Sequence, residues 1–134
     1  MNYFVWDVEK YSVGHADLDQ QHQQLLEIVN RLIEHVVLGK SDDFALTEIL
    51  LELNSYAARH FETEERVLMA IDYPLIHEQK EAHGNYIAKL SQCMMQLEQG
   101  GVDFMRLLEF VRKWWEHHIL TDDMAFKPLL EKGV

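Results

Sequence analysis

Cysteine is almost missing from this sequence, because Cys93 is the only one among 134 residues. A single cysteine excludes a disulfide within the chain and gives no support for export to an oxidising compartment. Long apolar runs are missing too, and the opening Met1-Asn2-Tyr3-Phe4 has neither a basic start nor an apolar stretch behind it. We therefore expect no signal peptide, no membrane-spanning helix and a cytoplasmic location.

Basic residues are scarce. Twelve lysines and arginines stand against 23 aspartates and glutamates, which gives a formal net charge of −11. Nucleic acids and anionic membranes are bound through basic patches. We therefore expect neither as a partner, and nothing in the sequence indicates a particular protein partner.

Apolar and charged residues are present in the proportions of a soluble globular protein, at 48% and 26%. A chain of 134 residues is long enough to bury one core. We expect a single domain over residues 1–134, in which residues 1–16 form an N-terminal arm.

Four stretches repeat apolar residues at intervals of three and four, which predicts helices with one buried face. They cover residues 17–38, 42–70, 75–99 and 104 up to Pro128. Residues typical of helix ends and turns lie between them: Asp17 or Asp19, Gly39, Ser41-Asp42, Pro74, Gly100-Gly101 and Asp103.

Strand-like alternation and internal repeats are absent from the sequence. Four long helices joined by short turns predict an all-α, antiparallel up-down-up-down four-helix bundle. An extended N-terminal arm lies over it, and residues 129–134 form a short tail.

Histidines and one carboxylate lie on the apolar faces of these helices. His60 and Glu64 are four residues apart and so share a helix face, and a buried carboxylate is costly unless it is paired or bound to metal. His22 and His83 come early in the first and third helices, whereas His60 and His118 come late in the second and fourth.

Antiparallel packing brings all four histidines to the same end of the bundle. A lone histidine on an apolar face is more often a hydrogen-bonded core residue, but four at one level with a buried carboxylate favour a transition-metal site. Two irons that share bridging carboxylates suit such ligands, and zinc or manganese suits them as well.

Several motifs together resemble the hemerythrin family, specifically its single-domain bacteriohemerythrins, over nearly the whole chain. They are Trp6-Asp7, Val13-Gly14-His15, Asp19-Gln20-Gln21-His22, His60-Phe61-x-x-Glu64-Glu65, Tyr73-Pro74 and Trp114-x-x-x-His118-Ile119-x-x-x-Asp123. The resemblance implies two iron ions with an oxygen-derived bridge and reversible binding of dioxygen or another small diatomic ligand.

Carried over by position, the resemblance assigns ligands to both irons. His22 and His60 bind one iron, His83 and His118 bind the other, and Glu64 and Asp123 bridge them. The family places a further histidine four residues before the position of His83, where this chain has Gln79. An amide oxygen is a weaker ligand than imidazole. Three outcomes are possible: Gln79 binds the iron weakly through its amide oxygen, it supports a water that binds the iron instead, or part of the protein lacks that iron.

Three neighbouring residues need separate interpretation. His77 is about 200° around the helix from Gln79 and should face away from the site. Asp123 is five residues after His118, about 140° away on an ideal helix, whereas Asp122 would align. The resemblance favours Asp123, which then requires a wide turn such as a π-bulge.

The residue after Trp114 is usually leucine in this family, and these two positions help to form the wall of the oxygen pocket. Here it is Trp115, which packs in the core, narrows the pocket or donates a hydrogen bond to a bound ligand.

The function that follows is dioxygen carriage, storage or delivery by a protein that is not an enzyme. Two alternatives stay open because of Gln79. One is a module that senses oxygen, nitric oxide or redox state, and the other is a diiron protein with oxidase- or peroxidase-like activity.

Overall fold

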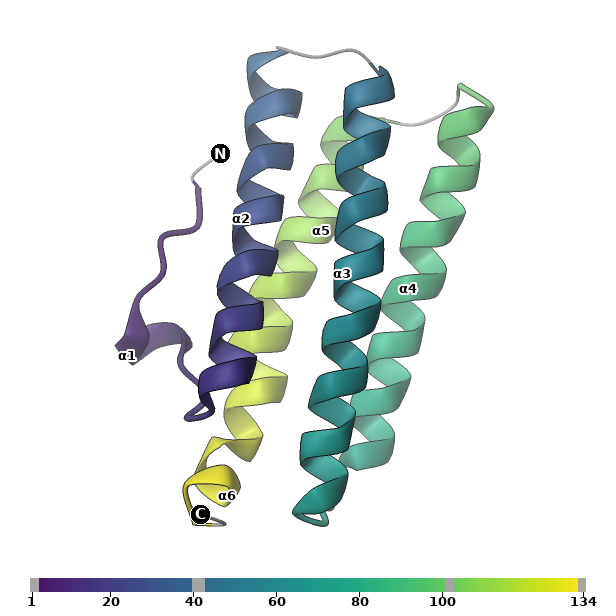
Figure 1. Ribbon diagram of the computed structural model, residues 1–134. Helices are drawn as coiled ribbons and strands as arrows, with labels where there is room; N and C mark the ends of the chain where they lie inside the picture. Colours follow the sequence, from purple (N-terminus) through teal and green to yellow (C-terminus); the bar gives the residue numbers. More distant parts are fainter. Residues whose placement is uncertain (1–2, 40–42, 101–102, 133–134) are drawn as a thin grey trace.

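The computed structural model describes residues 3–39, 43–100 and 103–132 (Figure 1). Four long helices lie side by side: α2 (Ala16–Leu38), α3 (Asp43–Ala70), α4 (Ile76–Glu98) and α5 (Phe104–His117). Helix α2 packs against α3 and α5, and α3 packs against α4. The predicted all-α bundle is confirmed. Two predicted features lie outside the described residues. They are Ser41-Asp42, where the second helix is predicted to begin, and Gly101, the second glycine of the predicted break.

The ends of α2 show how local chemistry sets the helix limits. Gly39 ends the helix with φ +59°, in the left-handed region that glycine tolerates best. The prediction that Asp17 or Asp19 caps its start is wrong, because His15 Nδ1 accepts from the Leu18 N–H at 3.3 Å. Asp19 instead accepts from the Ser12 hydroxyl at 2.6 Å and from the Val13 N–H at 2.8 Å. At the start of α5, Asp103 caps the helix as predicted.

The N-terminal arm lies over the bundle as expected, but it is not extended throughout. It contains the one-turn helix α1 (Val8–Tyr11), which Asp7 caps by accepting from the Glu9 N–H. Phe4 is buried, and its backbone exchanges two hydrogen bonds with the Asn30 side chain of α2, at 2.7 and 2.8 Å. These bonds fasten the arm to the bundle.

The chain after α5 stays helical to its described end. A π-helical segment, η1 (His118–Asp123), leads to a 3₁₀ turn, η2 (Met124–Phe126), and to α6 (Lys127–Lys132). The predictions that Pro128 limits the helix and that a tail follows are wrong. Pro128 lies in the first turn of α6, where its missing N–H leaves no bond unmade, and Leu130 is buried.

Two apolar clusters fill the bundle. The larger includes Leu25 and Trp115, about a turn away from His22 and His118. The smaller closes the other side of this level, with Leu18 a turn before His22 and Leu68 a turn after Glu64. Its other members are Val13, Tyr73, Phe126 and Leu130. The histidines therefore lie between two dry layers. Over the described ranges, no helix is both long enough and apolar enough to cross a bilayer.

The packing of α6 predicts different costs for two adjacent leucines. Leu130 is 6% exposed in the smaller cluster, whereas Leu129 is 39% exposed. Leu130→Ala should lower the free energy of unfolding by about 2 kcal/mol or more, because it leaves a cavity. Leu129→Ala should change it by less than about 0.5 kcal/mol. Urea unfolding of both variants measures the difference, and equal costs would show that α6 is not docked.

Candidate metal centre

Four imidazoles and two carboxylates meet inside one end of the bundle. They come from α2, α3, α4 and η1, and each is at most 2% exposed. The shared level predicted from the sequence is confirmed. Their ring Nε2 and carboxylate oxygen atoms form two groups, each compact enough to hold a metal ion.

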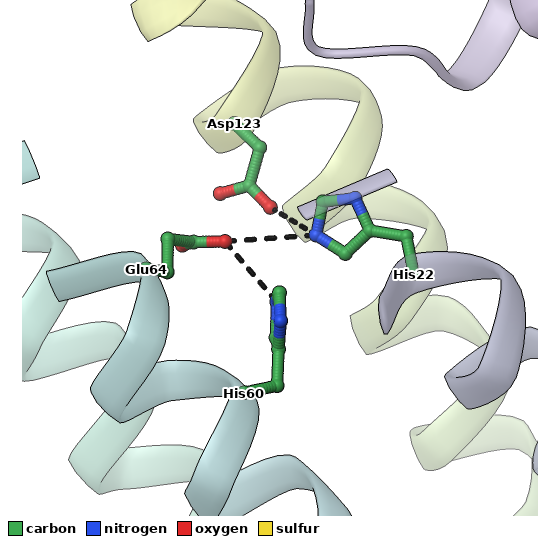
Figure 2. Close-up of side chains that lie close together, drawn as sticks. All are labelled: His22, His60, Glu64 and Asp123. Atoms are coloured by element: carbon green, nitrogen blue, oxygen red, sulfur yellow. Dashed lines mark ion pairs between the residues drawn. The ribbon is translucent and has the colours of Figure 1, made fainter. Parts of the chain in front are cut away.

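The first group consists of His22, His60, Glu64 and Asp123, whose side chains point toward one another (Figure 2). His22 Nε2 lies 3.1 Å from Asp123 Oδ2 and 3.5 Å from Glu64 Oε2. His60 Nε2 lies 3.1 Å from the same Glu64 oxygen. One oxygen of each carboxylate thus faces one pair of histidines.

The second group contains Glu64, His83 and His118. Glu64 Oε1 lies 3.0 Å from His83 Nε2 and 3.4 Å from His118 Nε2, and the two ring nitrogens are 3.1 Å apart. Asp123 Oδ1 lies 3.1 Å from His118 Nε2. Each carboxylate therefore divides its two oxygens between the two histidine pairs.

The π-helical segment decides which aspartate enters the site. In η1 the Met124 N–H bonds to the Ile119 carbonyl five residues earlier, so the wide turn carries Asp123 to the face of His118. Asp122 stays at the outer side, with Oδ2 3.0 Å from His118 Nδ1. The wide turn expected from the five-residue spacing is present.

Three of the four histidines have a polar partner on their outer ring nitrogen. His60 Nδ1 contacts Gln21 Oε1 at 2.7 Å, and His83 Nδ1 contacts Glu65 Oε2 at 2.8 Å. Asp122 has the same role at His118. Such partners hold Nδ1 as the protonated nitrogen and leave the Nε2 lone pair facing inward.

Sequence reasoning missed two of these outer partners. Gln21 and Glu65 occur in the motifs quoted above, but neither was given a role at the site. A weak signal existed, because Gln21 precedes His22 and Glu65 follows Glu64. Only the rotation of each helix about its axis shows that these side chains reach a neighbouring helix.

Protons balance the buried charges in the metal-free cluster. Burial lowers the pKa of His60 to about 4, against the opposing pull of Glu64. Burial would also lower the pKa values of His22 and His118, but the surrounding carboxylates raise them to about 9 and about 10. Burial and the Glu64 charge raise the pKa of Asp123 to about 6. The four histidines hold the pKa of Glu64 well below its usual range despite its burial.

The residues present fit a pair of transition-metal ions. His22 Nε2, His60 Nε2, Glu64 Oε2 and Asp123 Oδ2 are buried and have no hydrogen-bond partner within the described residues. Buried polar atoms are rarely left so. Contacts near 3 Å also match neighbouring ligands at right angles around an ion with bonds of about 2.1 Å. Nitrogen and oxygen donors suit iron, zinc and manganese.

Gln79 lies beside the second group but is not one of its members. It is 4% exposed and shares a face of α4 with His83. Its amide N–H₂ donates to the Asp122 carbonyl at 3.1 Å and to Asp123 Oδ1 at 3.3 Å. His77 is exposed, in line with the prediction that it faces away.

The two tryptophans lie against two of the clustered histidines. Trp114 stacks on His118 with ring centroids 4.5 Å apart, and the fully buried Trp115 lies 6.1 Å from the His60 ring. The Trp115 indole N–H donates to the Tyr86 hydroxyl at 2.9 Å. This donor is therefore engaged in the core and does not face a bound ligand. That the two rings form the wall of an oxygen pocket stays a prediction.

Comparisons with known proteins agree with this geometry. The family model of the hemerythrin HHE cation-binding domain matches residues 13–130. A bacteriohemerythrin of Clostridium acetobutylicum is 30% identical over 92% of this chain and 98% of its own. Myohemerythrin-1 of Phascolopsis gouldii is 28% identical over 95% and 94%. A crystal structure of wild-type hemerythrin superposes with a TM-score of 0.86 at 22% identity, covering 96% of this chain and 98% of that one.

The raised pKa values predict that metal binding releases protons. Near pH 7.5 and without a bound ion, the imidazoles of His22 and His118 are protonated on both ring nitrogens. The proton on Nε2 must leave before that atom can bind an ion. The affinity for Zn²⁺ should therefore rise with pH until about pH 9 to 10. Calorimetric titration of metal-free protein in buffers of different ionisation enthalpy should report about two protons released. Heats that do not depend on the buffer would contradict this assignment.

The π-helical segment predicts unequal effects for two adjacent aspartates. Asp123→Asn removes a carboxylate that faces both histidine pairs, so it should prevent binding of two ions per chain. Asp122→Asn keeps the ligands and weakens only the support of His118, so affinity should fall about 10–100-fold. Metal content after dialysis and competition with a chelator measure both. Equal loss in the two variants would be evidence against the inward position of Asp123.

Proposed function

The chain belongs to the hemerythrin family, and we propose on that premise that it is a non-heme diiron protein that binds dioxygen reversibly. One observation carries the proposal. Glu64 and Asp123 each place one oxygen at His22 and the other at the His83–His118 side. Two carboxylates divided in this way serve two ions held side by side.

The residues divide into two ligand sets with shared bridges. His22 and His60 would hold one iron, His83 and His118 the other, and Glu64 and Asp123 would join them. Two ferrous ions there would supply the electrons that dioxygen takes up on binding and returns on release. Gln21, Glu65 and Asp122 would hold the imidazoles in position through their Nδ1 atoms.

Burial favours a binding protein over an enzyme. His22, His60 and Glu64 are 0% exposed, so a molecule the size of dioxygen reaches them more readily than an organic substrate does. Phe61 and Trp115 add apolar surface near His60, with ring centroids 5.8 and 6.1 Å away. A dry surrounding protects a bound small molecule from reaction with water.

Gln79 favours a second candidate function. Gln79 stands where the family has a histidine. The iron at His83 and His118 would therefore have fewer protein ligands than in the family and would react more readily with small molecules. A sensor of oxygen, nitric oxide or redox state, or a protein with oxidase- or peroxidase-like activity, would use that reactivity. The lifetime of the oxygenated form separates these alternatives from a carrier.

We expect two irons per chain after anaerobic loading, and an optical band on oxygen addition that disappears under argon and returns with oxygen. His60→Ala should abolish the reversible band because it removes a ligand. His77→Ala, at an exposed histidine of α4, is the matched control and should leave the band unchanged. A single, irreversible oxidation of the wild-type protein would reject the carrier function and favour the oxidase-like alternative.

A further inference from the structure

A cavity of about 270 Å³ lies where the start of α4 faces η1 and η2. Gln79, Glu78 and Ala82 line it from α4, and Asp122 and Ala125 line it from the opposite side. Gln79 is 4% exposed and hydrogen-bonded to Asp123 Oδ1, the oxygen that faces His118, so it lies between this cavity and the second group.

The hydrogen bonds of the Gln79 side-chain amide show which of its atoms has no hydrogen-bond partner. The two N–H groups point to the Asp122 carbonyl and to Asp123 Oδ1. The amide oxygen is buried and has no hydrogen-bond partner in the described ranges. An unpaired buried acceptor costs about 1–3 kcal/mol, and a water or other O–H donor at this place would remove that cost.

The number of protein ligands that each ion would receive also indicates a water or other small ligand beside Gln79. Without a histidine at position 79, each ion would receive two imidazoles and one oxygen from each of Glu64 and Asp123. Iron sites with few protein ligands keep open positions for small molecules. The two ions would then be equal in their number of protein ligands, and the second would also take an exchangeable ligand.

We propose that the cavity at Gln79 is an entrance to a second ligand position, on the ion held by His83 and His118. This inference rests on the diiron function proposed above. In the resting protein the position holds a water that donates to the Gln79 amide oxygen. A small neutral molecule displaces this water.

The charge of the cavity decides the class of ligand. Glu78 and Asp122 both line it, so two carboxylate side chains lie at this opening. Two carboxylates at an entrance repel anions. The position therefore favours neutral molecules of about the size of water or a diatomic gas over anions.

Nitric oxide is a suitable neutral probe, because its iron adducts are counted by electron paramagnetic resonance and optical titration. Anaerobic diferrous protein should bind about two equivalents per chain, and Gln79→His about one, because the imidazole fills the second position. Gln79→Ala leaves the position open and should still bind about two. This variant also keeps the test valid should Gln79→His fold poorly.

A second pair of variants tests the route. Ala125→Phe fills the cavity at Gln79 without touching a ligand, and it should slow the uptake of one nitric oxide equivalent. Ala88→Phe is the matched control, since it lines a different cavity of about 450 Å³ between α3 and α4, next to His83 and Glu65. It should leave both uptake rates unchanged.

Metal content and the reversible oxygen band, measured on the same samples, separate the two proposals. With two irons and a reversible band, one equivalent of nitric oxide in both wild type and Gln79→His would overturn the second position alone. Equal slowing by Ala88→Phe and Ala125→Phe would overturn the route through this cavity. Fewer than two irons in the wild-type protein would overturn both proposals.

Discussion

The buried carboxylate of Glu64 is the constraint on which the rest of the structure depends. A carboxylate that is 0% exposed is tolerated only with charged or hydrogen-bonding neighbours. Here the Nε2 atoms of all four buried histidines lie within 3.5 Å of its oxygens, and each histidine comes from a different part of the chain. Four helices must therefore meet at one level. Positive charge at that level, from protons or from metal ions, offsets the cost of burying the carboxylates there.

The apolar layers on both sides make this polar level specific. The smaller cluster around Leu18 and Phe126 closes the end of the bundle, and the larger cluster fills the rest. Both clusters are apolar, so the inward Nε2 and carboxylate oxygen atoms have one another or a metal ion as partners. The outer partners Gln21, Glu65 and Asp122 are more accessible and fix the ring orientations without entering the site.

The π-helical segment η1 and the glutamine at position 79 are the two features that shape this site. The π-helical turn of η1 brings Asp123 inward, and Gln79 ties the same segment to α4 through two hydrogen bonds. The amide therefore supports the Asp123 carboxylate. This role explains how a neutral side chain is accommodated beside the cluster of histidines and carboxylates. It also leaves the His83–His118 side less crowded, next to a cavity.

The sequence by itself determined the helices, their antiparallel order and the inward position of four histidines and Glu64, because helical periodicity is local and four histidines at matched depths admit one common level. The resemblance to a known family added Asp123, which periodicity alone did not favour over Asp122. Only the tertiary structure decided how Asp123 turns inward, since a π-helical turn depends on packing against neighbouring helices. It also decided that α6 docks through Leu130 and that Glu65 supports His83. These contacts join residues on different elements and depend on how the elements are rotated relative to each other, and no local pattern records that rotation.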